Sequence, residues 1–165
     1  MRVGTLADII FRELDKSISG HEGLEVFAIE RAKFEGWVKV GLVRILRRYF
    51  KRIVPEEGHI DIVADDWAIE IKTINTNYTC PSVKKKYRPI TKNVEEFLED
   101  IKKLRNNAKY ENKVVFFIVF PLPEKSMDTW QQKHLSKIKR EVRNFFSHRF
   151  RFKNNIPGIM YIGQV

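Results

Sequence analysis

The chain has 165 residues, a length typical of one domain with a substantial apolar core, and residues 1–165 are expected to form a single domain. Hydrophobic residues make up 43% and charged residues 32% of it, which excludes a disordered chain. The formal net charge of +10 favours polyanionic partners such as nucleic acid.

The first part of the chain is predicted to contain two helices. Residues 4–18 carry apolar side chains at helical spacing, and a longer helix is predicted from Phe27 to Phe50 because its apolar residues form one stripe. Helical phase places Glu35 inside this stripe and Glu30 outside it. A carboxylate on a buried face needs a partner, so Glu35 is preferred over Glu30 as the acid that this helix supplies to the site. The alternative is that Glu35 pairs with Arg31 or Lys39, each four residues away.

The stretch from Gly58 to Asn75 is predicted to form a β-hairpin that turns at residues 64–67, after a first strand at residues 53–55. Apolar and polar side chains alternate in both arms, which places Asp61, Glu70 and Lys72 where they can converge. Two neighbouring carboxylates repel each other unless a cation lies between them, and hard oxygen ligands suit Mg²⁺ or Mn²⁺. A lysine beside such an ion can orient or deprotonate water and neutralise charge on a phosphate during hydrolysis. The alternative is an exposed charge pair that contributes under ~1 kcal/mol.

One pattern in this stretch consists of Asp61, eight further residues and then Glu70-x-Lys72 across a hairpin. It resembles the PD-(D/E)XK nuclease superfamily, which includes restriction endonucleases and archaeal Holliday junction resolvases. Ile60 stands where the family often has proline. The resemblance implies an α/β fold with a restriction-endonuclease-like αβββαβ core. It also implies that Asp61, Glu70 and the carbonyl of Ile71 bind Mg²⁺ or Mn²⁺ and that Lys72 is the catalytic lysine. Glu35 would complete the acidic cluster, because the family often supplies a glutamate from the preceding helix; Glu30 and Glu57 are the alternatives.

The rest of the chain is predicted to alternate between helices and strands. Residues 76–92 form a polar loop, followed by a helix at 93–106 capped by Asn93, a buried strand at 114–120 parallel to its neighbour, a helix at 127–147 and a strand at 158–163. Basic residues in the loop and on the outer face of the 127–147 helix suit contacts with nucleic acid, although a solvated surface is the alternative. The candidates for these contacts are Lys84, Lys85, Lys86, Tyr87, Arg88, Lys137 and Arg140.

These elements predict a mixed central sheet flanked by helices, with an extra N-terminal helix and a C-terminal helix and strand. The predicted function is a Mg²⁺-dependent deoxyribonuclease with DNA as its partner, and a homodimer is expected because a double-strand cut needs two sites. An RNase on the same scaffold shares these residues, and a non-catalytic nucleic-acid-binding module is the alternative from another class. With Cys80 as its only cysteine, no signal peptide and no apolar run long enough to span a membrane, the protein is expected in the cytoplasm without membrane contact.

Overall fold

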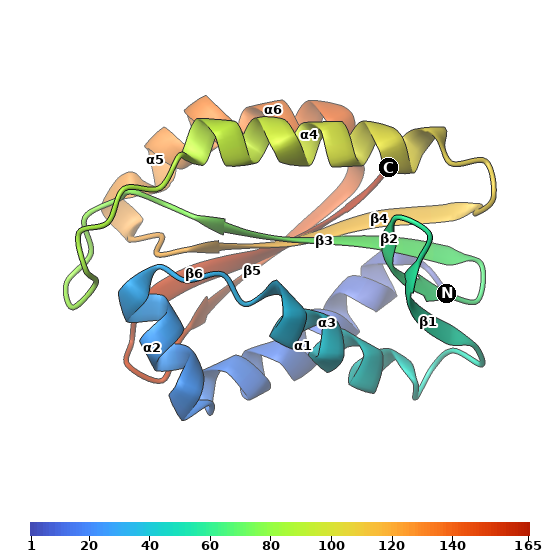
Figure 1. Cartoon of the computed structure of the whole chain (residues 1–165), viewed down its shortest axis with the longest axis horizontal. Coiled ribbons are helices and arrows are strands. Elements are labelled where there is room, and N and C mark those ends of the chain that lie inside the picture. The colour runs from blue at the N-terminus through green and yellow to red at the C-terminus, as the bar shows by residue number, and fades with distance from the viewer.

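A computed structural model describes all 165 residues and shows an α/β fold in which a mixed sheet of six strands lies between two layers of helices (Figure 1). The strand order is β1-β2-β3-β4-β6-β5, and every neighbouring pair is antiparallel except β3 and β4, which are parallel. The strands are β1 (Ile53–Glu57), β2 (Ile60–Ala64), β3 (Trp67–Asn75), β4 (Asn112–Phe120), β5 (Arg143–Arg151) and β6 (Pro157–Gln164).

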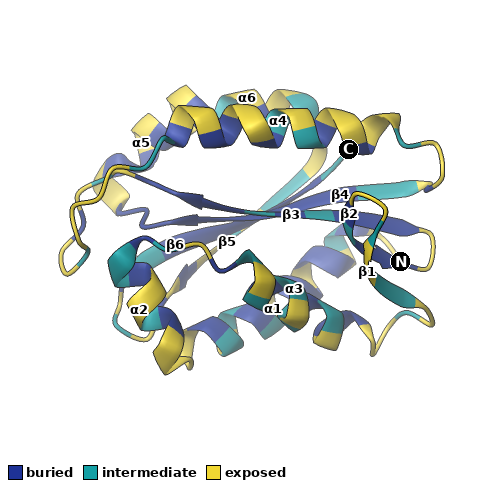
Figure 2. Cartoon of the chain, in the orientation of Figure 1, coloured by how far each residue is buried: buried dark blue, intermediate teal, exposed yellow.

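The helices cover both faces of the sheet and bury the side that faces it (Figure 2). One layer holds α1 (Val3–Ser19), α2 (Glu22–Glu30) and α3 (Glu35–Leu46). The other holds α4 (Ile90–Asn106) and a segment made of η1 (Glu124–Ser126), α5 (Met127–Trp130), the π-helical η2 (Gln131–Leu135) and α6 (Ser136–Glu141). No helix combines the length and apolar character that crossing a membrane requires.

The central strands divide their side chains between two apolar cores. On β3, Ile69 and Ile71 join the core beneath α1 and α3, whereas Ala68 and Ile74 join the core beneath α4. The run from Val114 to Phe120 on β4 is buried on both faces, which confirms the predicted central strand and its parallel pairing with β3. Because successive side chains of a strand point to opposite faces, the even-numbered residues of β3 face α4.

The predicted hairpin is confirmed. β2 ends at Ala64 and β3 begins at Trp67, and these two residues pair across the turn. The predicted helix at 93–106 is also present, but it begins at Ile90. Asn93 therefore lies inside the first turn and does not cap the helix.

The single helix predicted from Phe27 to Phe50 is wrong. α2 ends at Glu30, Arg31 adopts a left-handed backbone conformation with φ of 51°, and α3 begins only at Glu35. The apolar pattern continues across the break because both helices bury residues in the same core. Apolar spacing reports which side chains are buried, and it does not report whether the backbone between them is continuous.

The helix predicted at 127–147 is wrong in its last part. α6 ends at Glu141, and residues from Arg143 onward form the edge strand β5, paired with β6. Phe145 and Phe146, assigned to one helix face by the sequence, pack against opposite cores as strand neighbours do. The charged residues that alternate with them resemble a polar helix face, although they suit an exposed sheet edge equally well.

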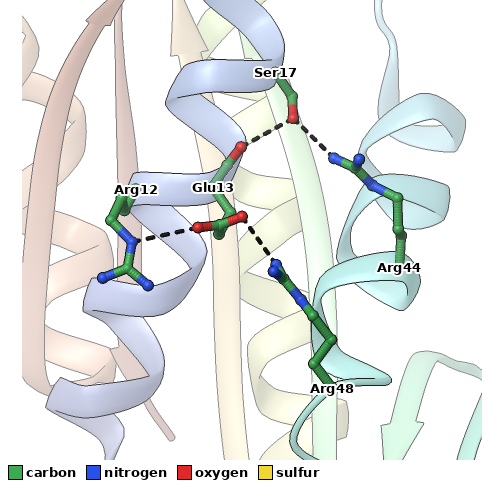
Figure 3. Close-up of polar contacts among 5 residues, drawn as sticks. All are labelled: Arg12, Glu13, Ser17, Arg44 and Arg48. Atoms are coloured by element: carbon green, nitrogen blue, oxygen red, sulfur yellow. Dashed lines mark hydrogen bonds and ion pairs between the residues drawn. The ribbon is translucent and has the colours of Figure 1, made fainter.

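Polar contacts join α1 to α3 along their solvent-exposed side (Figure 3). The carboxylate of Glu13 accepts hydrogen bonds from Arg12 Nε at 3.3 Å and from Arg48 Nη2 at 2.9 Å. Ser17 Oγ accepts from Arg44 Nη2 at 3.0 Å and donates to the carbonyl of Glu13 at 2.9 Å. These contacts supplement the apolar contact between α1 and α3.

Two substitutions in α3 test this packing. Leu42 is fully buried, so Leu42→Ala should lower the free energy of unfolding by about 2–5 kcal/mol through lost burial and a new cavity. Val40, two residues earlier, is 71% exposed, so Val40→Ala should change it by less than about 0.5 kcal/mol. Urea titration of both variants measures the difference, and equal losses would contradict the assigned burial.

Candidate functional site

The candidate site lies where β2 and β3 separate. Their pairing reaches Ile62 and Ile69, and beyond this point the backbone N–H of Ile71 donates to Asp61 Oδ2 at 2.8 Å. A buried N–H needs an acceptor, and here a carboxylate takes the place of a strand carbonyl. Asp61 is thereby fixed at the edge of β3.

Glu70 lies beside Asp61, on the face of the sheet that α4 covers. Burial raises the pKa of Glu70 to about 8, and the negative charges of Asp61 and Asp100 and a hydrogen bond with Asp61 act in the same direction. Lys72 opposes this rise. The structure thus places two predicted carboxylates next to each other, as expected, and a cation between them would relieve their repulsion.

Lys72 projects to the same face, and its side chain is only 17% exposed. Its Nζ atom lies 3.6 Å from Oδ2 of Asp100, a residue of α4. Sequence analysis missed Asp100, although helical spacing places it at the flank of the apolar stripe that includes Phe97 and Leu104. A charged residue at the margin of a buried helix face was the available signal.

Lys39 is a second amine at the site. Its Nζ lies 2.8 Å from Asp61 Oδ1 and 2.9 Å from Glu56 Oε1. Burial lowers the pKa of Lys39, but the hydrogen bonds to Asp61 and Glu56 outweigh burial and raise it above the ordinary value. The sequence offered Lys39 only as a partner for Glu35, because its proximity to Asp61 depends on how α3 crosses the sheet. The Asp61 carboxylate thus already has a cationic partner in Lys39.

Glu35 meets the same sheet edge from the other layer. Its Oε2 accepts the backbone N–H of Thr73 at 2.6 Å, with Thr73 Oγ1 at 3.4 Å. Thr73 is two residues beyond Ile71, so Glu35 and Asp61 bind alternate N–H groups along one edge of β3. Glu35 was preferred to Glu30 because of their relative positions on one helix. That reasoning is wrong, because Glu30 lies in α2 and Glu35 in α3.

The two alternative acids are engaged elsewhere. Glu30 forms an ion pair with Lys84. Glu57 accepts hydrogen bonds from Lys109, from Tyr110 Oη at 2.8 Å and from Arg52, and these contacts lower its pKa to about 2. The bonds hold Glu57 beside Tyr110 and away from Asp61.

The donor set at the sheet edge suits a hydrated Mg²⁺ ion. In an antiparallel strand the N–H and C=O of one residue face the same side, so the carbonyl of Ile71 is directed toward the edge that holds Asp61. No group of three or more His, Cys, Asp or Glu side chains is positioned to hold a metal ion. Mg²⁺ commonly uses one or two protein carboxylates and completes its shell with water and substrate phosphate, and Asp61 with Glu70 fits this arrangement.

The predicted nucleic-acid-binding residues lie on two separate elements. Lys85, Lys86 and Tyr87 are exposed in the loop between β3 and α4, whereas Lys84 is paired with Glu30. Arg88, at the end of the same loop, is half-buried and its backbone is bonded to Asn77. The other two candidates, Lys137 and Arg140, are exposed on α6. The structure does not gather all of these residues into one patch.

A cavity of about 800 Å³ lies away from these carboxylates. It is lined by segments around Cys80, Pro123 and Arg149, and its charged residues Arg149 and Glu124 already pair with each other at 2.7 Å. The cavity and the candidate site are therefore distinct.

Comparison of the chain with protein-family models, curated proteins and solved structures finds no significant match. The geometry therefore carries the functional interpretation. The cluster at the edge of β3 combines the carboxylates of Asp61, Glu70 and Asp100 with the amines of Lys39 and Lys72. Such a set can bind a cation, position a water and counter the charge of a phosphate.

The raised pKa of Glu70 predicts a pH dependence of stability. In metal-free protein, folded Glu70 keeps its proton up to about pH 8, whereas the unfolded chain releases it near 4.5. The unfolded chain then binds fewer protons between these values, so the free energy of unfolding falls as pH rises through this window. Glu70→Gln should remove this contribution. Urea unfolding in EDTA at several pH values compares the two slopes, and a wild-type slope equal to that of the variant would contradict the assignment.

Proposed function

We propose that this protein is a Mg²⁺-dependent deoxyribonuclease that hydrolyses phosphodiester bonds, with α3-β1-β2-β3-α4-β4 as a restriction-endonuclease-like αβββαβ core of the PD-(D/E)XK kind. One observation carries the proposal: Asp61 and Glu70 adjoin each other at an open edge of β3, with Lys72 on the same face. The order and pairing of the strands support it, because the meander β1-β2-β3 is followed by α4 and a parallel β4.

Each residue has a role in this proposal. Asp61, Glu70 and the Ile71 carbonyl hold the divalent ion, and Mn²⁺ is able to replace Mg²⁺. When bound, such an ion lowers the pKa of a coordinated water and stabilises negative charge on the phosphate. Lys72 orients the water and neutralises charge on the phosphate. Asp100 holds the Lys72 ammonium in place.

Glu35 and Lys39 serve the same acidic edge. Glu35 fixes the β3 backbone through Thr73 and completes the acidic cluster. Lys39 shares its ammonium between Asp61 and Glu56, so it retains an acidic partner when Asp61 binds a metal ion. Lys39 therefore neutralises Asp61 in the metal-free protein without leaving a buried charge unpaired after metal binding.

The surplus of basic residues favours DNA as the substrate, since counterion release strengthens binding to phosphates. Cleavage of both strands of a duplex needs two copies of the site, so a homodimer acting in the cytoplasm belongs to this proposal.

Replacement of Lys72 tests catalysis. Lys72→Ala should lower the rate of Mg²⁺-dependent DNA cleavage by about 100-fold or more, because it removes a charge that stabilises the transition state. Lys102→Ala removes an equal charge from the exposed face of α4, where Lys102 pairs with Glu99, and should leave the rate unchanged. Gel analysis of labelled duplex, junction, flap and single-stranded DNA, with RNA counterparts, measures cleavage.

Each outcome of that panel has a clear meaning. Equal rates for wild type and Lys72→Ala would overturn the role of Lys72. Cleavage of RNA alone would assign an RNase. Binding of DNA without cleavage of any substrate would favour the non-catalytic module.

Direct metal titration tests the ion site independently of turnover. Calorimetry should detect Mn²⁺ binding to the wild type and none to Asp61→Ala, because that variant removes one of only two carboxylates in contact with the ion. Glu96→Gln removes an exposed carboxylate that lies near Lys92 on α4, and should bind Mn²⁺ as the wild type does. Binding that survives in Asp61→Ala would place the ion elsewhere.

A further inference from the structure

Arg31 is a buried cation without an acidic partner. It is 2% exposed, burial lowers its pKa, and no carboxylate is among the groups that influence that pKa. Its guanidinium donates to three backbone carbonyls of the following loop: Nε to Lys84 at 2.9 Å, Nη1 to Thr76 at 2.5 Å and Nη2 to Tyr78 at 2.8 Å. A guanidinium has five N–H groups, so two remain for a ligand.

A second set of bonds closes the same loop. Asn77 Oδ1 accepts the backbone N–H of Arg88 at 2.5 Å, and Asn77 Nδ2 donates to the Arg88 carbonyl. The backbone N–H of Lys84 donates to the carbonyl of Ile29 at 2.9 Å. The loop is thus held at both ends, and its tip from Lys85 to Tyr87 is presented in a fixed position, which reduces the entropy lost on binding a ligand.

An open hollow of about 460 Å³ lies between Arg31 and this tip. Three cations and no acid line it, and neither Lys85 nor Lys86 forms an ion pair that would neutralise it. Asn77 and Thr79 add polar side chains, and the Tyr87 ring, 81% exposed, stands at the hollow. Such a surplus of positive charge selects an anion, and arginine and lysine together suit phosphate.

We propose that this hollow, which we call the Arg31 pocket, binds one phosphate group of a nucleic-acid strand while the neighbouring base stacks on Tyr87. Arg31 supplies its two free N–H groups, and Lys85 and Lys86 contact the phosphate from the loop tip. Base stacking on an aromatic ring tolerates any base, so the pocket adds affinity without sequence preference. The inference rests on the nucleic-acid partner of the proposed function and does not depend on cleavage.

Oligonucleotide binding by paired variants tests the Arg31 pocket. Fluorescence anisotropy compares single-stranded DNA carrying a 5′-phosphate with the same strand carrying a 5′-hydroxyl, in the presence of EDTA over a range of salt. The double variant Lys85→Gln/Lys86→Gln should bind at least tenfold more weakly and lose about 0.7 from the salt slope, which is the value for one phosphate contact on a single strand. Tyr87→Phe, which keeps a stacking ring, should bind as the wild type does, and Tyr87→Ala should bind about tenfold more weakly.

The matched control is Arg47→Gln/Lys51→Gln, which removes two exposed charges just after α3, at the opposite end of the sheet from the loop (Figure 1). It should bind nearly as the wild type does. An equal loss in control and pocket variants, or no loss in the pocket variant, would overturn the inference, as would a wild type that binds neither strand. If the wild type prefers the strand with the 5′-phosphate and the pocket variant does not, the ligand is a terminal phosphate. If the wild type binds both strands equally, the ligand is an internal phosphate.

Cleavage assays on the same proteins separate the two proposals. The pocket variant should need at least tenfold more DNA than the wild type to reach half of its maximal Mg²⁺-dependent cleavage rate, because it binds the strand more weakly. Wild type that binds through the Arg31 pocket but never cleaves would overturn the nuclease proposal alone. If the wild type cleaves DNA and the pocket variant binds DNA as tightly as the wild type does, the Arg31 pocket is overturned and the nuclease proposal stands.

Discussion

The bond between the N–H of Ile71 and the carboxylate of Asp61 determines how the candidate site is built. β2 stops pairing with β3 after Ile62 and Ile69, which leaves backbone groups of a central strand without a strand partner. Unpaired buried backbone groups are costly, so side chains must supply the acceptors. Asp61 and Glu35 do so at alternate residues, and the need to satisfy β3 thereby draws acids from two elements to one edge.

Charge balance at this edge follows from that arrangement. One oxygen of Asp61 accepts the backbone N–H of Ile71 and the other is paired with Lys39, so both carboxylate oxygens have partners. Glu70 has no such compensation, and burial beside Asp61 and Asp100 favours its protonated form. The two carboxylates of the pair therefore differ in their bonding partners in the metal-free protein. A cation bound at Glu70 must displace its proton, which makes metal affinity rise with pH through the pKa of about 8.

The sequence predicted the local features of the site and missed those that depend on tertiary contacts. Strand alternation was sufficient to place Asp61, Glu70 and Lys72, because a tight turn fixes the register of a hairpin. Asp100 and Lys39 reach the same point from α4 and α3, and their approach depends on how each helix crosses the sheet. The first part of β5, up to Ser147, was predicted as the end of a helix because Val142, Phe145 and Phe146 continue the helical spacing of the preceding apolar residues, whereas pairing with β6 decided its conformation.

Arg31 connects the break between the helices to the basic loop. Its left-handed backbone ends α2, and the chain then begins a new helix at Glu35, which places that carboxylate within reach of Thr73. Its side chain meanwhile holds the loop that leaves β3 at Thr76. An uninterrupted helix would carry Glu35 to another phase and bury no guanidinium against the loop. The residue that broke the predicted helix therefore sets the position of one acid of the candidate site and of the basic segment next to it. Glu35 contacts Thr73 near the end of β3, and Arg31 contacts Thr76 just after it, so the acidic edge and the loop are fixed within a few residues of each other.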